Sequence, residues 1–348
     1  MKFRRLHLLV ALATLMALLP IGPAAAKTTS PPDSASEHQR IVDFWTHERV
    51  SRAIPRDFLY NPDSGRFQMA KPDNPGGGKG GGGGSDDGGD TSSVLGASWN
   101  KNGAVADTTG KVLFAMDGSY YVCSGSLVTE GAGDRSVVLT AAHCAFDEAN
   151  SRFATNWMFI PNYDADPAPL NTSGTFCAGT SYGCWTARAL VVHDGYASQP
   201  AFNDQAVRYD FAFAVLNEGG HDSQTQADSL GSQPIDFTGD ALGADTYAFG
   251  YPAAKKYKGN DLVYCRDGLG FDPFNSNETY RIDCNMTGGS SGGPWFDDFD
   301  EAPGTGTLTS VNSYGYTGVT AMHGPMFNGS TEALYTEATR AKADTIVS

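Results

Sequence analysis

Short runs of apolar residues, some alternating with polar residues and some continuous, dominate the later two thirds of this 348-residue chain. Glycine, asparagine and aspartate separate the runs, which is the pattern of short strands joined by turns. The pattern predicts an all-β domain, either a barrel or a sandwich. The clearest runs are residues 111–116, 120–123, 136–139, 187–192, 210–216 and 246–250.

Two segments show helical rather than strand periodicity. Near the N-terminus, Ser34 and Glu37 form a capping box, and apolar residues then recur at roughly helical spacing until Pro55. Residues 331–346 also have a helical pattern. We therefore expect one helix before the β-rich part and one at its end. The second helix would pack through Leu334, Ala338, Ala341 and Ile346.

Composition divides the chain before the β-rich part begins. Basic residues, an apolar run over residues 8–19 and then three alanines have the order of a secretory signal peptide, and the run is too short for a membrane span. A glycine-rich stretch follows later, and glycine resists ordering into packed elements. The predicted plan is a signal peptide at 1–26, a front segment at 27–75, a flexible linker at 76–91 and a main domain at 92–348.

The front segment is too short to bury a sizeable core alone. Two interpretations compete. It is a pro-segment that docks its apolar stripe on the main domain until it is removed, or it is a disordered spacer. The helical stripe favours the pro-segment.

Six cysteines follow the predicted signal peptide, and export favours their pairing as three disulfides. None has the C-x-x-C spacing of a metal site. The acidic run 297–301 permits a calcium site, but a solvated turn is the simpler interpretation. The net charge of −15 argues against nucleic acid and anionic membranes as partners. We expect a monomer, secreted to the extracellular space or periplasm, with no metal or cofactor.

Two motifs carry candidate chemistry. The first is the run Thr140-Ala141-Ala142-His143-Cys144, in which a cysteine and small residues can hold the histidine rigidly. The second is TGGSSGGP at residues 287–294, which contains two adjacent serines. This octapeptide fits both the G-x-S-x-G elbow of α/β-hydrolases and the glycine-rich loop of an endopeptidase.

Chain order disfavours the α/β-hydrolase. Those enzymes carry the serine before the acid and the histidine, and their elbow leads into a helix. Here Gly292-Gly293-Pro294 begins a helix poorly, and His323 is the only histidine after Ser291.

The two motifs resemble those of the chymotrypsin/trypsin-like serine endopeptidase family, of the secreted bacterial type, and further matches extend over nearly all of residues 96–348. The resemblance implies two packed six-stranded antiparallel β-barrels with a C-terminal helix. It also implies that His143 is the general base and Ser291 the nucleophile, with oxyanion donors at Gly289 and Ser291.

The resemblance assigns the acid of the triad to Asp210, which opens an alternating apolar strand. The carboxylate would fix the tautomer of His143 and stabilise its cation. Asp204 and Asp194 are rivals, but they lie in polar or turn sequences that suit the surface better.

A substrate-binding strand is implied by Ser313-Tyr314-Gly315, which resembles the family's S-W-G segment with tyrosine in place of tryptophan. Such a segment binds substrate as an added strand. An ordinary core strand is the alternative.

The family's pocket-base position falls near Asn285, and residues 285–287 supply no acid that would attract lysine or arginine. Bacterial glutamyl-selective relatives carry a histidine where this chain has Asn312, so that selectivity is also disfavoured. His323 either lines the pocket from a later strand or lies in a surface loop.

Disulfide pairing is implied by the family for Cys123 with Cys144. Adjacency suggests Cys177 with Cys184 and Cys265 with Cys284, although spacing alone does not fix connectivity.

Ser290 stands where many animal members of the family carry an aspartate that receives a new N-terminal ammonium. A neutral hydroxyl cannot hold a buried ammonium as an ion pair. We therefore expect activation by removal of the front segment, with a cut anywhere in the glycine linker being sufficient.

The sequence predicts a secreted serine endopeptidase that hydrolyses protein or peptide substrates through an acyl-enzyme, with a triad of His143, Asp210 and Ser291. The alternative is a secreted binding protein that kept the protease fold and lost catalysis.

Overall fold

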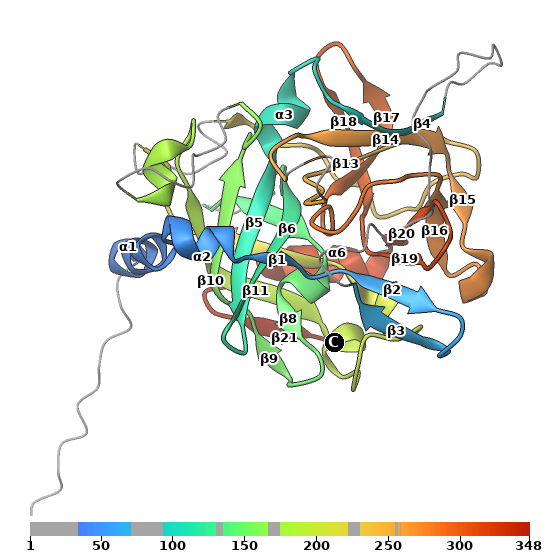
Figure 1. Ribbon diagram of the computed structural model, residues 1–348, viewed down its shortest axis with the longest axis horizontal. Coiled ribbons are helices and arrows are strands. Elements are labelled where there is room, and N and C mark those ends of the chain that lie inside the picture. Colours follow the sequence, from blue (N-terminus) through green and yellow to red (C-terminus); the bar gives the residue numbers. More distant parts are fainter. Residues whose placement is uncertain are drawn as a thin grey trace, which may run out of the picture. The chain divides into compact units, whose positions relative to one another are not determined.

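The computed structural model describes residues 34–70, 93–129, 135–165, 175–221, 230–254, 257 and 259–348. The predicted signal peptide at 1–26 and linker at 76–91 lie outside these residues. Strands are the main regular elements of the described chain, and the helices are few and short (Figure 1). None of the helices in the described ranges is long and apolar enough to cross a membrane.

Six antiparallel strands close into a barrel in the first half of the main domain. They are β5 (Thr109–Met116), β6 (Ser119–Val128), β7 (Val137–Thr140), β10 (Thr155–Pro161), β11 (Trp185–His193) and β12 (Ala212–Leu216). β6 pairs with both β5 and β7, which completes the ring. Every residue of β5, β7 and β12 is buried, and their β-branched and aromatic side chains suit a packed pleated surface.

The second half of the main domain consists of two sheets around a second core that includes Trp295 and Met322. One sheet contains β4 (Val94–Ser98), β13 (Asp245–Gly250), β14 (Val263–Gly268), β17 (Pro294–Asp300) and β18 (Thr305–Val311). The other contains β15 (Gly270–Phe271), β16 (Thr279–Ile282), β19 (Tyr314–Tyr316) and β20 (Met322–Pro325), joined by two strands of the front segment. The all-β prediction is confirmed, with the first barrel closed and the second half built as two sheets.

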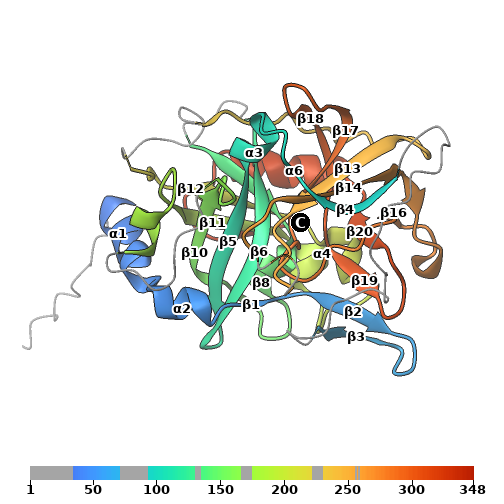
Figure 2. The ribbon, with the colours of Figure 1, turned by 45° about the horizontal axis from the view of Figure 1, so that its top comes forward.

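The front segment is ordered on the main domain from residue 34 to residue 70. It forms α1 (Ser34–Phe44), α2 (His47–Ser51), β1 (Ile54–Pro55), β2 (Phe58–Asn61) and β3 (Arg66–Met69). Figures 1 and 2 show it as the blue ribbon that passes from the side of β10 to the side of β19. The disordered-spacer interpretation does not fit this arrangement.

Two helices replace the single helix predicted before Pro55. The chain leaves the helical path at Trp45, whose side chain is fully buried and whose indole N–H donates to the backbone oxygen of Asn156. Thr46 then accepts a hydrogen bond from the backbone N–H of Arg49 and caps the second helix. Burial of one large side chain therefore divides the helix.

The C-terminal helix is shorter than predicted. α6 (Gly329–Ala338) buries Leu334 and Ala338 as expected, but the chain then turns and ends as β21 (Thr345–Val347), paired with β11. Ile346 is 46% exposed rather than packed in a helix. The β-branched run at the end favours a strand, and Asp344 accepts a hydrogen bond from the backbone N–H of Leu190 where the pairing begins.

The remaining described elements are short and connect the larger ones. They are α3 (Ala104–Thr108), α4 (Asp194–Ala197), the two-stranded ribbon of β8 (Phe146–Asp147) and β9 (Arg152–Phe153), and four 3-10 turns at Ala142–Cys144, Phe176–Gly179, Ala206–Tyr209 and Pro273–Asn275.

Candidate active site

His143 lies directly after a barrel strand, on a 3-10 turn that a disulfide holds. Cys144 of the turn is bonded to Cys123 of β6 across 21 positions of sequence, and a bridge of this span stabilises a fold by roughly 3 kcal/mol. The structure also contains the other two pairs suggested by adjacency, Cys177–Cys184 and Cys265–Cys284. None of the described cysteines is free.

Asp210 holds His143 through two hydrogen bonds. One carboxylate oxygen accepts from the backbone N–H of His143 at 2.8 Å, and the other lies 2.7 Å from the ring Nδ1. Both side chains are fully buried. A carboxylate at Nδ1 requires the proton there, so Nε2 is left as the unprotonated nitrogen of the neutral ring. The pair therefore presents a basic nitrogen on the far side of the imidazole.

Ser313 adds a third hydrogen bond to the same carboxylate. Its Oγ donates to Oδ2 of Asp210 at 2.5 Å. A carboxylate that accepts several hydrogen bonds is fixed in orientation, and so is the histidine that it holds. Ser313 comes just before β19, so the second half of the domain helps to position a histidine carried by the first half.

Ser291 lies in a tight glycine-rich loop whose backbone only glycine adopts easily. Gly289 has φ +98° and Gly292 has φ +78°, in the region that favours glycine. A Cβ at residue 292 would also lie only 2.2 Å from Oγ1 of Thr140. The glycines of the motif therefore let the serine loop pack directly against the barrel strand that leads to His143.

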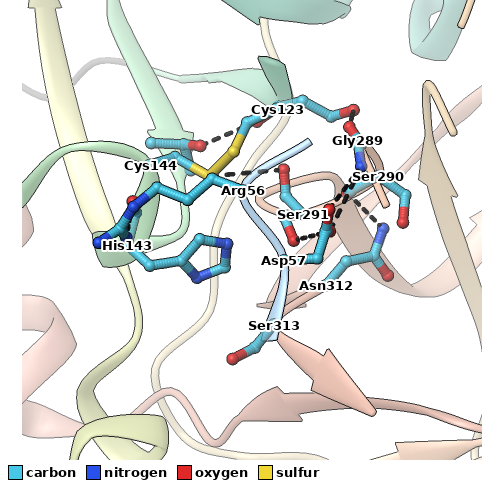
Figure 3. Close-up of a disulfide and its surroundings, with 12 residues drawn as sticks. Arg56, Asp57, Cys123, His143, Cys144, Gly289, Ser290, Ser291, Asn312 and Ser313 are labelled. Atoms are coloured by element: carbon cyan, nitrogen blue, oxygen red, sulfur yellow. Dashed lines mark hydrogen bonds between the residues drawn. A yellow bond between two sulfur atoms is a disulfide. The ribbon is translucent and has the colours of Figure 1, made fainter. Parts of the chain in front are cut away.

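The two serines of the loop have different surroundings. Ser290 is buried, and its Oγ donates to the backbone oxygen of Thr287, within its own loop. Ser291 lines the cavity described below. Figure 3 shows Ser291 and His143 beside the Cys123–Cys144 disulfide, with a third residue, Asp57, next to the serine.

Asp57 of the front segment binds the serine loop through its carboxylate. The Oγ of Ser291 donates to Oδ1 of Asp57 at 2.6 Å, and the backbone N–H of Gly289 donates to Oδ2 at 3.0 Å. The Nε2 of His143 is buried and has no hydrogen-bond partner within the described residues. The serine hydroxyl thus points to the front segment rather than to the histidine.

Burial raises the pKa of Asp57 above the ordinary value of an aspartate. Its hydrogen bond from Ser291, the positive charge that His143 can carry and the amide of Gly289 act in the opposite direction. Protonation of this carboxyl therefore becomes easier than in a free peptide.

A cavity lies beside Ser291 and is lined mainly by apolar side chains of the second half. Its walls include Met286, Val319, Ala321 and Met322, together with the Cys284 end of a disulfide. Ser313, Tyr314 and Gly315 line it as well. From the front segment, Asp57, Phe58, Leu59 and Ala70 border the same space.

Asn285 is not among the residues that line this cavity. Its Oδ1 accepts a hydrogen bond from the hydroxyl of Tyr257 at 2.6 Å, and its backbone N–H donates to the backbone oxygen of Leu95 in β4. The expected pocket-base position is therefore turned toward the neighbouring strand, and Met286 takes a place in the wall.

His323 lies on β20 and is fully buried, so it does not occupy a surface loop. Its ring stacks on Tyr314 with centroids 4.9 Å apart, and it lies behind the cavity wall rather than in it. Burial lowers its pKa to about 4, and the nearby carboxylate of Asp272 opposes this shift only in part. The ring is neutral at pH 7.

The two rival aspartates do not contact His143. Asp194 begins α4, and Asp204 borders a second hollow together with Tyr60 and Tyr316. In the acidic run near residue 300, the carboxylate of Glu301 is paired with Lys101 and accepts from the hydroxyl of Tyr247.

Comparison with known proteins agrees with this geometry. A model of the trypsin-like peptidase domain matches residues 123–302. The protease Anisep from Arthrobacter nicotinovorans is 37% identical, with a TM-score of 0.56, over 68% of this chain and 96% of that protein. The thermostable serine protease AL20 from an extremophilic microorganism is 33% identical, with a TM-score of 0.56, over 68% of this chain and 99% of that protein. No curated protein matches at a significant level.

A glutamyl endopeptidase shares the fold at 17% identity and a TM-score of 0.52, over 71% of this chain and 97% of that protein. The fold and its closed barrel are thus those of the chymotrypsin-like serine proteases. The chain itself belongs to the trypsin-like peptidase family and is a serine endopeptidase, so its substrates are proteins or peptides.

Sequence reasoning missed Asp57, which binds the serine loop. It follows Pro55-Arg56, beyond the end of the helix predicted in the front segment, and no spacing rule connects it to the serine loop. The pro-segment interpretation was the one available signal, because a docked segment needs some contact with the domain that it covers.

Proposed function

We propose that this chain is a secreted serine endopeptidase that cleaves peptide bonds through an acyl-enzyme formed on Ser291. The observation that carries the proposal is the buried Asp210 carboxylate, which holds His143 at both its backbone N–H and its Nδ1. This arrangement leaves Nε2 as the free base beside the serine loop.

In the proposed reaction, Nε2 of His143 takes the proton of Ser291 as Oγ attacks the substrate carbonyl. Asp210 keeps the ring in the required tautomer and stabilises the imidazolium that forms. The histidine then gives its proton to the leaving amine, and water hydrolyses the acyl-enzyme by the reverse sequence.

The developing oxyanion would be held by the backbone amides of Gly289 and Ser291. The amide of Gly289 already donates to an oxygen of the Asp57 carboxyl group, which supports its role as a hydrogen-bond donor at this site. Losing one donor of this kind typically raises the barrier by about 3 kcal/mol.

Substrate would bind as an added strand along Ser313, Tyr314 and Gly315. Tyr314 to Tyr316 pair with β2 of the front segment, so this edge accepts an extended chain. The apolar cavity beside Ser291 supports cleavage after apolar side chains. Among the described residues of the main domain that line it, none is a carboxylate that would attract lysine or arginine, and Asn285 is turned away.

The proposed enzyme is exported and divided into four parts along the chain. Residues 1–26 would direct export and be removed, residues 27–75 would be a pro-segment, 76–91 a linker and 92–348 the peptidase domain. Three disulfides are consistent with an oxidising compartment, extracellular or periplasmic. The acidic enzyme would act as a monomer without nucleic-acid or membrane partners.

The test is covalent labelling by a fluorophosphonate, with the labelled peptide identified by mass spectrometry. Full-length protein and its Asp57→Ala variant are both used, because the carboxyl group of Asp57 is hydrogen-bonded to the hydroxyl of Ser291. We expect labelling at Ser291 that is lost in Ser291→Ala and retained in Ser290→Ala. If neither protein is labelled and neither cleaves unfolded casein, the silent binding protein replaces the enzyme.

A further inference from the structure

The front segment crosses the active site by pairing with a strand on each side of it. Ile54 and Pro55 of β1 pair in parallel with Tyr121 and Val122 of the barrel. Three residues after Pro55, β2 begins and pairs in parallel with β19 of the second half. Figure 2 shows these two contacts in one continuous run of blue ribbon. Arg56 and Asp57 are the two residues that lie between them.

The Asp57 carboxyl group binds the serine hydroxyl and one of the two amides assigned to the oxyanion site. Ser291 Oγ and the Gly289 amide both donate to it. An oxyanion site presents hydrogen-bond donors to an oxygen atom, so an oxygen of a carboxyl group is a suitable ligand of it. The group presented to the serine is a side-chain carboxylate and contains no amide bond to cleave. It can occupy the site without becoming a substrate.

Arg56 fixes the position of its neighbour. Its buried guanidinium donates to the backbone oxygen of His143 at 2.6 Å and to the carboxylate of Glu148 at 3.2 Å. Tyr196 donates to the same carboxylate of Glu148. Separation of a buried, hydrogen-bonded charge pair of this kind is strongly unfavourable, because each partner would be left as an unpaired buried charge. Asp57 is thereby held against the serine loop.

Phe58 covers the histidine. Its ring meets that of His143 edge to face at 5.6 Å and stacks on Phe202 at 4.1 Å. The next residue, Leu59, pairs with Gly315 on the edge assigned to substrate. Histidine, serine and strand edge are therefore all occupied by three consecutive residues of the front segment, 57–59.

The anchor of the segment lies away from the active site. Ile41, Val42, Trp45 and Val50 belong to the same buried core as the barrel. The guanidinium of Arg40 also donates to the side chain of Asn156. None of these contacts depends on chain continuity through residues 76–91.

We propose that residues 34–70 are a built-in inhibitor that stays bound after the linker is cut, with the Asp57 carboxylate as the ligand of the oxyanion site. This inference rests on the proposed function, since it concerns the regulation of the same site. It replaces the expectation that any cut in the glycine linker activates the enzyme. Activation then requires cleavage or unfolding of the segment itself.

The test uses the full chain with a recognition sequence for a highly specific endopeptidase placed between Gly80 and Gly84. Fluorophosphonate labelling rates are measured before and after the cut, and native mass spectrometry measures whether the fragment stays bound. We compare the parent with Asp57→Ala, Asp57→Asn and Asp63→Ala. The last is a matched control, because Asp63 is exposed in the turn after β2.

The cut parent and cut Asp63→Ala are expected to retain the fragment and to label as slowly as the uncut chain. Asp57→Ala is expected to label at least tenfold faster, and Asp57→Asn to lie between. A second variant, Trp45→Ala, should release the fragment on cutting, because it removes the buried anchor without touching the site.

Two results would overturn the inference: a fragment that leaves the cut parent without denaturant, or equal labelling rates for the parent and Asp57→Ala. Absence of labelling in every variant would instead refute the proposed function. In that case the affinity of the cut fragment for the main domain tests the inference by itself. The inference requires the fragment to bind more weakly in Asp57→Ala than in Asp63→Ala, and equal affinities would overturn it.

Discussion

The hydroxyl of Ser291 donates a 2.6 Å hydrogen bond to the carboxylate of Asp57, which lies 234 positions earlier in the chain. In the proposed mechanism that proton goes to the Nε2 of His143, which has no hydrogen-bond partner within the described residues. In the described arrangement the serine hydroxyl is therefore bonded to the front segment and not to the histidine.

Inhibition by the front segment is expected to weaken as pH rises. Burial raises the pKa of Asp57 in the bound state above its value in a free peptide, so binding takes up a proton between the two values. The contribution of this proton to fragment binding is complete below the pKa of Asp57 in the free fragment. It is lost as pH rises through the pKa of Asp57 in the bound fragment. Fragment affinity after linker cleavage, measured by fluorescence anisotropy from pH 3 to pH 8, should fall over that window.

The control for this dependence is Asp57→Asn, which cannot titrate. Glu148 and His143 also face this region, and they remain in both proteins, so the difference between the two profiles belongs to Asp57. Identical profiles for the two proteins would contradict the prediction.

Replacing the acid of the triad should reduce turnover far more than binding. In the Asp57→Ala chain, Asp210→Asn is expected to lower kcat by about 10⁴-fold with little change in KM, because an amide at Nδ1 favours the wrong tautomer. Ser313→Ala should lower kcat roughly tenfold, since it removes one hydrogen bond to the charged carboxylate. Peptide hydrolysis under saturating conditions measures both. Asp204→Asn is the control, and a comparable loss there would contradict the assignment.

The peptide-library profile should show cleavage after apolar residues of the size of leucine, methionine or phenylalanine. Met286 and Met322 line the cavity beside Ser291, and neither can pair with a charged side chain. Met322→Ala should extend tolerance to larger aromatic residues, because it removes side-chain volume from the wall. A dominant preference for lysine, arginine or glutamate would show that another pocket receives the side chain.

Local sequence predicted the parts of the site that are local in the structure. His143 and Ser291 each lie within a compact motif, where small residues and glycines dictate the backbone. Asp210 was predicted from the strand that follows it. Asp57 and Arg56 were not predicted, because their partners lie far away in sequence and ordinary charged residues carry no signature of such contacts. Similarly, helical periodicity predicted a single helix before Pro55, whereas burial of Trp45 divides this stretch into two helices.

Pocket lining was also beyond local prediction. Asn285 occupies the expected position along the chain, but the direction of its side chain depends on Tyr257 and on β4, which packs beside it. The sequence offered two places for His323, a strand that lines the pocket or a surface loop, and the structure shows a buried strand residue that does not line the cavity. Whether it faces the cavity or the core behind it is decided by the stacking of Tyr314, a tertiary contact.

Burial of His323 should make the protein less stable in mild acid. Its pKa is lowered to about 4 in the folded state, whereas an unfolded histidine titrates near 6.5. The unfolded chain therefore binds the proton first, and the free energy of unfolding falls as pH drops from about 6.5 toward 4, by at most roughly 3 kcal/mol. Urea unfolding at several pH values, compared with His323→Gln, measures this contribution. The glutamine variant has no titrating group there, so its stability should fall less over the same interval even if its stability at pH 7 is lower. Parallel plots of the free energy of unfolding against pH for the two proteins would contradict this prediction. They would mean that the fold does not resist protonation of His323, although its ring is fully buried between Tyr314 and Tyr316.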